Sequence, residues 1–143
     1  MASAIIVGDG PAGLSAALFL AKKGIDTTVI GQDESWMHKA LLLNYLGIPK
    51  MEGPQFMQAC REQVTELGAK LVKEEVKAVA KVDAGFEVTT SQTHSADYLI
   101  LATGPKHDLA ESLGLSKEGK GIAADRDGKT AVDKLYVVGW SSR

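Results

Sequence analysis

The sequence predicts an α/β fold in which helices cover a parallel sheet and a three-stranded antiparallel meander is added to it. Three patterns carry this prediction: a strand-helix-strand sequence at the start, a glycine-rich loop inside it, and open alternation of polar and apolar residues after Glu74. With 143 residues, 45% of them apolar, the chain is long enough for one domain around a single core.

Residues 1–30 predict a β-α-β unit. Ala4–Val7 is a continuous apolar run that ends at Gly8, as is typical of a buried parallel strand. From Pro11 to Lys23 apolar residues recur at helical spacing, and Gly24 follows as the stop. Asp26–Ile30 predicts a second strand, joined to the first by a right-handed crossover.

The middle of the chain predicts a loop, a helix and then strands. Residues 31–53 are irregular, with room for about one helical turn. A second helix is expected after Gly53-Pro54, with Gly68 as its stop, and Ala69–Val72 predicts a third strand. Residues 74–102 predict three antiparallel strands that end in the apolar run 98–102.

The remainder of the chain, residues 103–134, is rich in loops. It leads to a last predicted strand, Leu135–Val138.

The loop Gly8-Asp9-Gly10-Pro11-Ala12-Gly13 has the composition of a phosphate cradle. The first glycine allows a tight turn, the second lets the backbone approach a pyrophosphate, and the third lets helix and strand pack closely. The helix N-terminus adds free N–H groups and a partial positive charge. Because the loop follows a strand and opens a helix, it predicts dinucleotide binding rather than a purely structural turn.

Composition argues against several other classes of function. The chain has 16 basic and 18 acidic residues and no basic stripe, so we expect no nucleic-acid partner. Its apolar stretches are broken well before a bilayer-spanning length and no basic leader precedes the first strand, so we expect a cytoplasmic protein without membrane contact. The single cysteine, Cys60, forms no Cys-x-x-Cys pair, and we interpret it as a core residue.

No metal site is predicted. His94 and His107 lie in predicted turns without a second ligand at suitable spacing, and we interpret both as solvated loop residues. We expect Trp36, Met37 and His38 to serve in packing rather than as a lid.

Three separated motifs, "IIVGDGPAGLSAALFLAKKG", "YLILATG" and "LYVVGW", resemble the FAD-binding domain of the thioredoxin reductase family, within the glutathione reductase superfamily. The resemblance implies a Rossmann-like FAD-binding domain that covers residues 1–143. It also implies that the first motif binds the FAD pyrophosphate, that the Ala-Thr-Gly turn passes close to the cofactor, and that the last strand ends beside the ribityl phosphate. "NYLGIP" is similar to the family's loop near the isoalloxazine, which implies that Asn44 lies by the flavin.

The predicted cofactor-binding residues follow from the glycine loop and from these motifs. They are Gly8, Gly10, Pro11, Ala12, Gly13, Gly31, Gln32, Asp33, Asn44, Val76, Thr103, Gly104, Gly139 and Trp140.

The sequence departs from the family pattern at three points. The second strand ends in Gly31 instead of an acid that holds the adenosine ribose, so Asp33 or Glu34 is the nearest substitute. The last strand ends in Gly139-Trp140 where the family has Gly-Asp. Residues 105–134 contain no second glycine loop, so we expect a single FAD-binding domain with no inserted NADPH-binding domain and no dithiol.

Two functions are compatible with these motifs. In one, a bound FAD exchanges electrons between an unknown donor and an unknown small-molecule or protein acceptor. In the other, the domain binds FAD or NAD(P) without turnover, as a sensor or as a subunit of a larger redox complex. In both cases we expect a homodimer through the loop 36–48 and Trp140, because a missing nucleotide domain leaves an apolar patch there.

Overall fold

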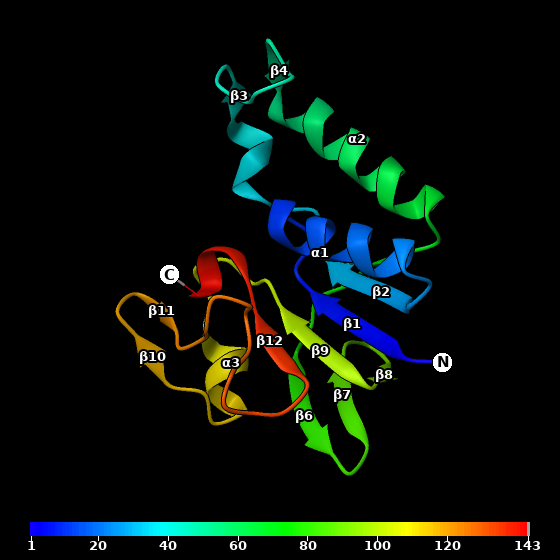
Figure 1. Ribbon diagram of the computed structural model, residues 1–143, viewed down its shortest axis with the longest axis vertical. Helices are drawn as coiled ribbons and strands as arrows, with labels where there is room; N and C mark the ends of the chain where they lie inside the picture. The colour runs from blue at the N-terminus through cyan, green and yellow to red at the C-terminus, as the bar shows by residue number, and fades with distance from the viewer. Residues whose placement is uncertain (143) are drawn as a thin grey trace.

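A computed structural model describes residues 1–142, and a five-stranded parallel sheet forms its centre (Figure 1). The strand order is β12-β9-β1-β2-β5. The bounds of these strands are Ser3–Val7 for β1, Asp26–Gly31 for β2, Lys70–Lys73 for β5, Tyr98–Leu101 for β9 and Leu135–Val137 for β12. The chain therefore builds outward from β1 to β5 on one side and returns to fill the other side with β9 and β12.

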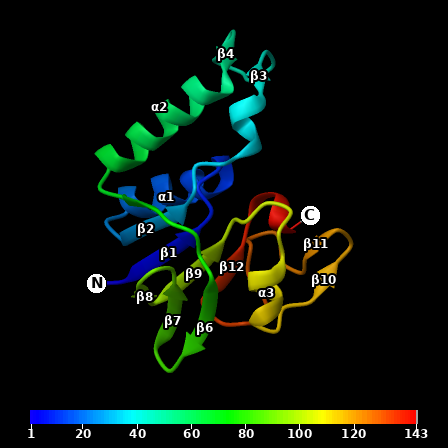
Figure 2. The ribbon, with the colours of Figure 1, turned by 180° about the vertical axis from the view of Figure 1, so that it is seen from behind.

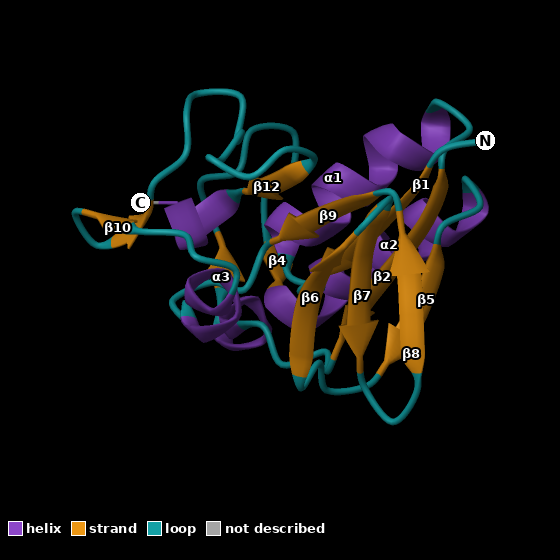
Figure 3. Ribbon diagram, turned by 90° about the horizontal axis from the view of Figure 1, so that it is seen from below, coloured by secondary structure: helices purple, strands orange, loops and turns teal. Residues whose placement is uncertain are grey.

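Helices cover one face of the sheet, and the antiparallel meander covers the other (Figures 2 and 3). The helices are α1 (Pro11–Lys22) and α2 (Gly53–Glu66), and the meander consists of β6 (Ala78–Val82), β7 (Gly85–Thr89) and β8 (Thr93–Ala96). The short helix α3 (Asp108–Ser112) lies on the meander side. The molecule thus has three layers around two apolar clusters.

Alternation along the central strands separates the two clusters. In β1, Ile6 packs with Met57 of α2 on the helical face, whereas Ile5 packs with Phe86 of the meander on the other. Three of these side chains, Ile6, Met57 and Phe86, are fully shielded from solvent. Burying one side chain of this size contributes about 1.5–3 kcal/mol, so both layers are held firmly to the sheet.

Short elements fill the connections. They are the 3₁₀ turns η1 (Trp36–Lys39) and η2 (Gly139–Ser142), and the two-residue strands β3 (Leu41–Leu42), β4 (Met51–Glu52), β10 (Lys117–Glu118) and β11 (Gly121–Ile122). The predicted helical turn within 31–53 corresponds to η1. The β3–β4 and β10–β11 pairs and α3 were not predicted, because their sequences have no strong periodicity.

The β-α-β unit, the second helix and the three-stranded meander are confirmed. The prediction that the run 98–102 ends the meander is wrong, because the meander closes with β8. The run instead forms β9, which pairs in parallel with β1 and β12. Its unbroken apolar character reflects this central position, where both faces of the strand are covered.

Asp97, between β8 and β9, holds the start of the central strand. Its Oδ2 accepts hydrogen bonds from the backbone N–H of Ser3 at 2.9 Å and from Ser3 Oγ at 3.2 Å. The backbone donation from Ser3, more than any other contact, lowers the pKa of the Asp97 carboxyl below its ordinary value. The ionised form is therefore favoured by folding, so it stabilises the protein above the unfolded-state pKa and ceases to do so as the pH falls through the lower folded-state pKa.

We expect Asp97→Asn to destabilise the protein at neutral pH, and the difference from wild type to shrink as the pH falls below about 4. Urea unfolding of both proteins across a pH series measures this. Asp83→Asn, at an exposed turn position, serves as the control and should follow wild type. A constant difference between wild type and Asp97→Asn at every pH would contradict the role of the ionised carboxylate.

Within residues 1–142, none of the helices combines the length and the apolar character needed to cross a bilayer.

Candidate functional site

The carboxyl ends of the parallel strands meet at one edge of the molecule. The glycine loop follows β1, residues 32–35 follow β2, the Thr103-Gly104 turn follows β9, and η2 follows β12. β1 lies between β2 and β9, and the direction of strand addition reverses between β1 and β9. In open α/β sheets this reversal point is where ligands bind, outside the carboxyl ends of the strands.

Two glycines of the loop are required by contacts that leave no room for a side chain. A Cβ at Gly8 would lie 2.1 Å from the carbonyl oxygen of Ala102, and the residue has a φ of 111°. A Cβ at Gly13 would lie 1.9 Å from the carbonyl oxygen of Gly8. The loops after β1 and β9 therefore touch, and α1 begins directly against its own strand.

The N-terminus of α1 opens on this edge without a side-chain cap. Gly10 is the N-cap, Pro11 is the first helical residue, and the first turn has no acidic side chain. Within residues 1–142 no side chain caps this end of the helix, so its first free N–H groups remain available to an anion. The end of β12 also reaches this point, because a Cβ at Gly139 would lie 2.5 Å from the Cβ of Ala12.

A network of charged side chains lies beside the loop, at the end of β2. Asp9 is only 7% exposed, and its Oδ2 accepts hydrogen bonds from the Asp33 N–H at 3.0 Å and from Arg61 Nη1 at 3.1 Å. Asp33 Oδ1 lies 2.8 Å from His38 Nε2 and 3.8 Å from Arg61 Nη1. Arg61 projects from α2, so the network links α2 to the tips of β1 and β2.

Two exposed tryptophans form a pair at the same edge. The rings of Trp36 in η1 and Trp140 in η2 lie with their centroids 5.1 Å apart and their planes at 82°, in an edge-to-face contact. They are 67% and 56% exposed. Met37 packs against the helical cluster, as expected of a packing residue. Trp36 packs against the ring of Trp140 and is otherwise largely exposed.

The other predicted site residues lie at different distances from the strand-end edge. Thr103 Oγ1 lies 3.4 Å from Oγ of buried Ser141, which ties the turn after β9 to η2. A hollow of about 510 Å³ beside the end of β12 includes Gly139 in its lining. Val76, after β5, packs against the meander cluster. Gln32 precedes the charged network.

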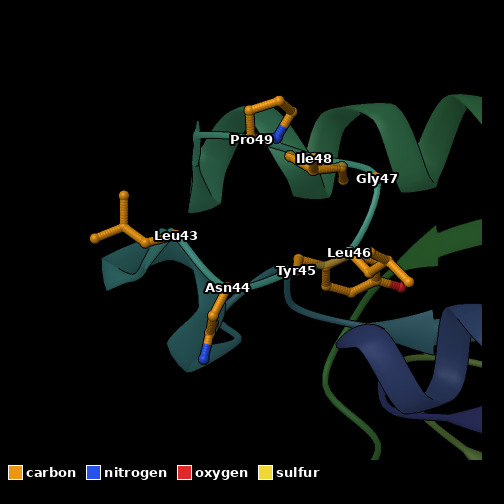
Figure 4. A pocket seen from close by; sticks show the side chains of 7 residues that line it. All are labelled: Leu43, Asn44, Tyr45, Leu46, Gly47, Ile48 and Pro49. Carbon is orange, nitrogen blue, oxygen red and sulfur yellow. The ribbon is translucent and has the colours of Figure 1, made fainter.

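Asn44 is not brought to the strand ends. It lies between β3 and β4, in a segment that projects beyond the start of α2 (Figure 1). Residues 43–49 of this segment line an open hollow of about 410 Å³, to which Asn44 and Leu43 contribute (Figure 4). Its contact with a flavin stays a prediction.

Both histidines interpreted as solvated differ from that expectation. His94 lies within β8, with its Nε2 3.3 Å from Thr90 Oγ1 and 4.0 Å from Glu74. His107 precedes α3, and its Nε2 is the one buried side-chain nitrogen or oxygen within residues 1–142 that has no hydrogen-bond partner. Cys60 is partly buried, as a core residue would be, and burial raises the pKa of its thiol.

Two residues of this site, Asp9 and Arg61, were not among the predicted cofactor-binding residues. Asp9 occupies a variable position of the glycine motif, and Arg61 lies on a helix whose contacts the sequence does not define. One signal could have found the first residue. The strand expected to end in an acid ends in glycine, while an acid stands in the loop beside it.

The fold and the strand-end edge together define a Rossmann-like domain of the FAD-binding kind. A family model described as pyridine nucleotide-disulphide oxidoreductase matches residues 2–106 and 46–139. The chain belongs to this family and is thioredoxin reductase-like.

Individual relatives agree with this assignment. The chain is 35% identical to thioredoxin reductase of Treponema pallidum, over 94% of its own length and 46% of the relative's. It therefore spans about half the length of this curated relative. The crystal structure of the atypical thioredoxin reductase TRi from Desulfovibrio vulgaris Hildenborough superposes with a TM-score of 0.90 at 18% identity, covering 97% of this chain and 89% of that one. A ferredoxin-flavin thioredoxin reductase from Clostridium acetobutylicum gives 0.86 at 16% identity, covering 99% and 88%. At these identities the two superpositions show the fold alone.

The tryptophan pair supplies a direct optical test of where a cofactor binds. Both tryptophans of the chain belong to it, and both lie beside the N-terminus of α1 and the end of β12. We expect saturation with FAD to quench most of the tryptophan emission, and Trp36→Phe and Trp140→Phe each to retain quenching of the remaining ring. Unchanged emission at saturation would place the flavin elsewhere.

Proposed function

We propose that the chain binds FAD at the strand-end edge and serves as an oxidoreductase module that passes electrons between an unidentified donor and acceptor. One observation supports this most strongly: the N-terminus of α1 lies uncapped at the reversal point of the sheet, beside a loop where glycines are required by contact. Membership of an oxidoreductase family supports the redox role.

Each part of the edge has a role in this proposal. The first N–H groups of α1 hold the pyrophosphate, and Gly10 lets it approach the backbone. The turn at Thr103-Gly104 and the end of β12 at Gly139 flank the cofactor. FAD supplies the redox chemistry when bound, and the protein orients it and limits its contact with water.

The donor in this proposal is not NADPH acting directly on the chain. Residues 105–134 carry no second glycine loop, so no inserted site within this chain holds a pyridine nucleotide beside the flavin. A reduced partner protein or small molecule delivers the electrons instead. Binding of FAD or NAD(P) without turnover is the second candidate, and the single cysteine favours it because no dithiol can relay electrons.

The test is a visible spectrum of the purified chain after incubation with FAD and removal of the free cofactor. A protein-bound flavin spectrum is expected, and a colourless protein would overturn the proposal. Anaerobic mixing with a chemical reductant and then with NADPH separates the two functions. Chemical reduction of the bound flavin is expected in both cases, because the cofactor itself takes the electrons. Reoxidation by an added acceptor that is faster than that of free reduced FAD indicates a redox module, and reoxidation no faster than that indicates a binder. Rapid bleaching by NADPH alone would contradict the proposed absence of direct reduction.

We also propose that the chain forms a homodimer, in which a second copy covers an exposed apolar surface. Large exposed apolar side chains are concentrated in the segment 36–46, where Leu46 is 99% exposed and Leu43 64%. A two-fold contact covers such a surface and does not propagate further. Light scattering at micromolar concentration should give a dimer, Leu46→Lys should give a monomer, and the matched variant Phe19→Lys on α1 should leave the dimer intact.

A further inference from the structure

We infer that Asp9, and not a residue at the end of β2, accepts the hydrogen bond from the adenosine ribose of the bound dinucleotide, with Arg61 positioning its carboxylate. The inference rests on the proposed function and adds a specificity-determining residue to it. Dinucleotide-binding β-α-β units hold this ribose with an acid about 20 residues beyond the glycine motif, and the second strand here ends without one.

The side chain of Asp9 occupies the space beside Gly31. A Cβ built on Gly31 would lie 2.4 Å from Asp9 Cγ, 2.6 Å from its Oδ1 and 2.8 Å from its Oδ2. The carboxylate that starts from the tip of β1 therefore fills the space that a side chain at the end of β2 would occupy. Gly31 has no positive φ, so its requirement for glycine comes from this contact and not from the backbone.

Within the part of the chain that the structure describes, one carboxylate oxygen of Asp9 is free to accept a hydrogen bond from a ligand. Oδ2 accepts from both the Asp33 N–H and Arg61 Nη1. Within residues 1–142 no hydrogen bond to Oδ1 is found. These two donors fix the orientation of the carboxylate and leave one acceptor oxygen for a ligand hydroxyl.

Asp33 is the nearest alternative acceptor to Asp9. Asp33 Oδ1 is already engaged by His38 Nε2 at 2.8 Å, and its side chain is 29% exposed against 9% for Asp9. A carboxylate shielded from water gains more from a ligand hydrogen bond than one that water can reach. Of the two acids, Asp9 is better oriented and better shielded.

The negative charge of Asp9 must be compatible with a pyrophosphate bound nearby. A carboxylate inside a phosphate-binding loop would repel a pyrophosphate, but that of Asp9 is directed toward Gly31 and is paired with Arg61. The pairing offsets its negative charge, so its repulsion of a pyrophosphate bound at the loop is reduced. A 2′-phosphate has no hydroxyl proton to donate to Asp9, so a ribose that carries one loses this hydrogen bond. The network therefore selects a dinucleotide with free ribose hydroxyls.

The experiment compares two ligands by calorimetric titration: FAD, and an FAD analogue that lacks the 2′-hydroxyl of the adenosine ribose. We expect wild type to bind FAD about 10- to 100-fold more tightly than the analogue, as for a hydrogen bond to a charged group. In Asp9→Ala/Arg61→Met, which removes the acceptor without leaving Arg61 unpaired, the two ligands should bind within about twofold of each other. Asp33→Ala removes the rival acceptor and should keep the preference of wild type.

A reciprocal variant tests the exchange of position. Gly31→Glu alone should lose FAD binding, because its side chain meets the Asp9 carboxylate. Asp9→Ser/Gly31→Glu restores an acid at the end of β2 and should recover the preference for FAD over the analogue. Thermal melts of every variant establish that it is folded before titration.

The outcomes separate this inference from the proposed function. If wild type binds no FAD, the proposed function fails first. If wild type binds FAD and the analogue equally, no acceptor for this hydroxyl exists and the inference is overturned without any substitution. If Asp33→Ala abolishes the preference while Asp9→Ala/Arg61→Met retains it, the acceptor is Asp33.

Discussion

Gly13→Ala is expected to destabilise the protein by about 3 kcal/mol or more, a value typical of severe overpacking. The added methyl would lie 1.9 Å from the carbonyl oxygen of Gly8, where α1 packs against the loop that follows β1. The methyl is attached directly to the helix backbone and the carbonyl belongs to the loop backbone, so neither can rotate aside and the helix must move away from the sheet. Urea unfolding followed by circular dichroism measures the loss.

Gly24→Ala provides the comparison. A Cβ at Gly24 would meet no other atom within 4 Å, but the residue has a φ of 81°. The substitution should therefore destabilise the protein by about 1 kcal/mol. If Gly13→Ala were no more destabilising than Gly24→Ala, the close contact between helix and strand would be contradicted.

Gly10→Val is expected to abolish FAD retention while the protein stays folded. A Cβ at Gly10 would lie 3.2 Å from Ser35 Oγ, a contact that a small movement of Ser35 relieves. The two further methyl groups of valine are expected to fill the space where a phosphate approaches the backbone. The variant should melt within a few degrees of wild type and show no bound flavin in its visible spectrum.

Gly10→Ala gives an intermediate test, with weakened but measurable binding. A full flavin spectrum from Gly10→Val would refute the assignment of this loop to the pyrophosphate.

Local sequence patterns predicted the part of the fold in which the contacting residues are close together along the chain. The β-α-β unit was evident because strand, glycine loop, helix and strand each have their own period or punctuation within residues 1–31. The order of β9 and β12 in the sheet was not evident, because no local pattern states which distant strand an apolar run will join. The run 98–101 was therefore assigned to the wrong sheet.

In the candidate site, too, local features could be predicted from the sequence and contacts between distant residues could not. Backbone positions such as Gly8 and Gly13 were identifiable because glycine is required there by a contact that the motif implies. The network of Asp9, Asp33 and Arg61 was not identifiable as a unit, since it joins the tips of two strands to the middle of α2. The exposure of Trp36 was also missed, because its partner, Trp140, lies more than a hundred residues away.

The central position of β1 has a consequence for how the chain folds during synthesis. Ile6 pairs with Val29 on one side, soon after it is made, but its other neighbour, Ile100, belongs to a strand made much later. A nascent chain can form its β-α-β unit early while the β9 side of β1 stays unpaired, and β9 in turn waits for β12. An apolar strand with an open edge is a template for pairing with other chains. Synonymous changes or pauses that slow translation of residues 32–97 should therefore lower the yield of native protein without changing its stability once folded.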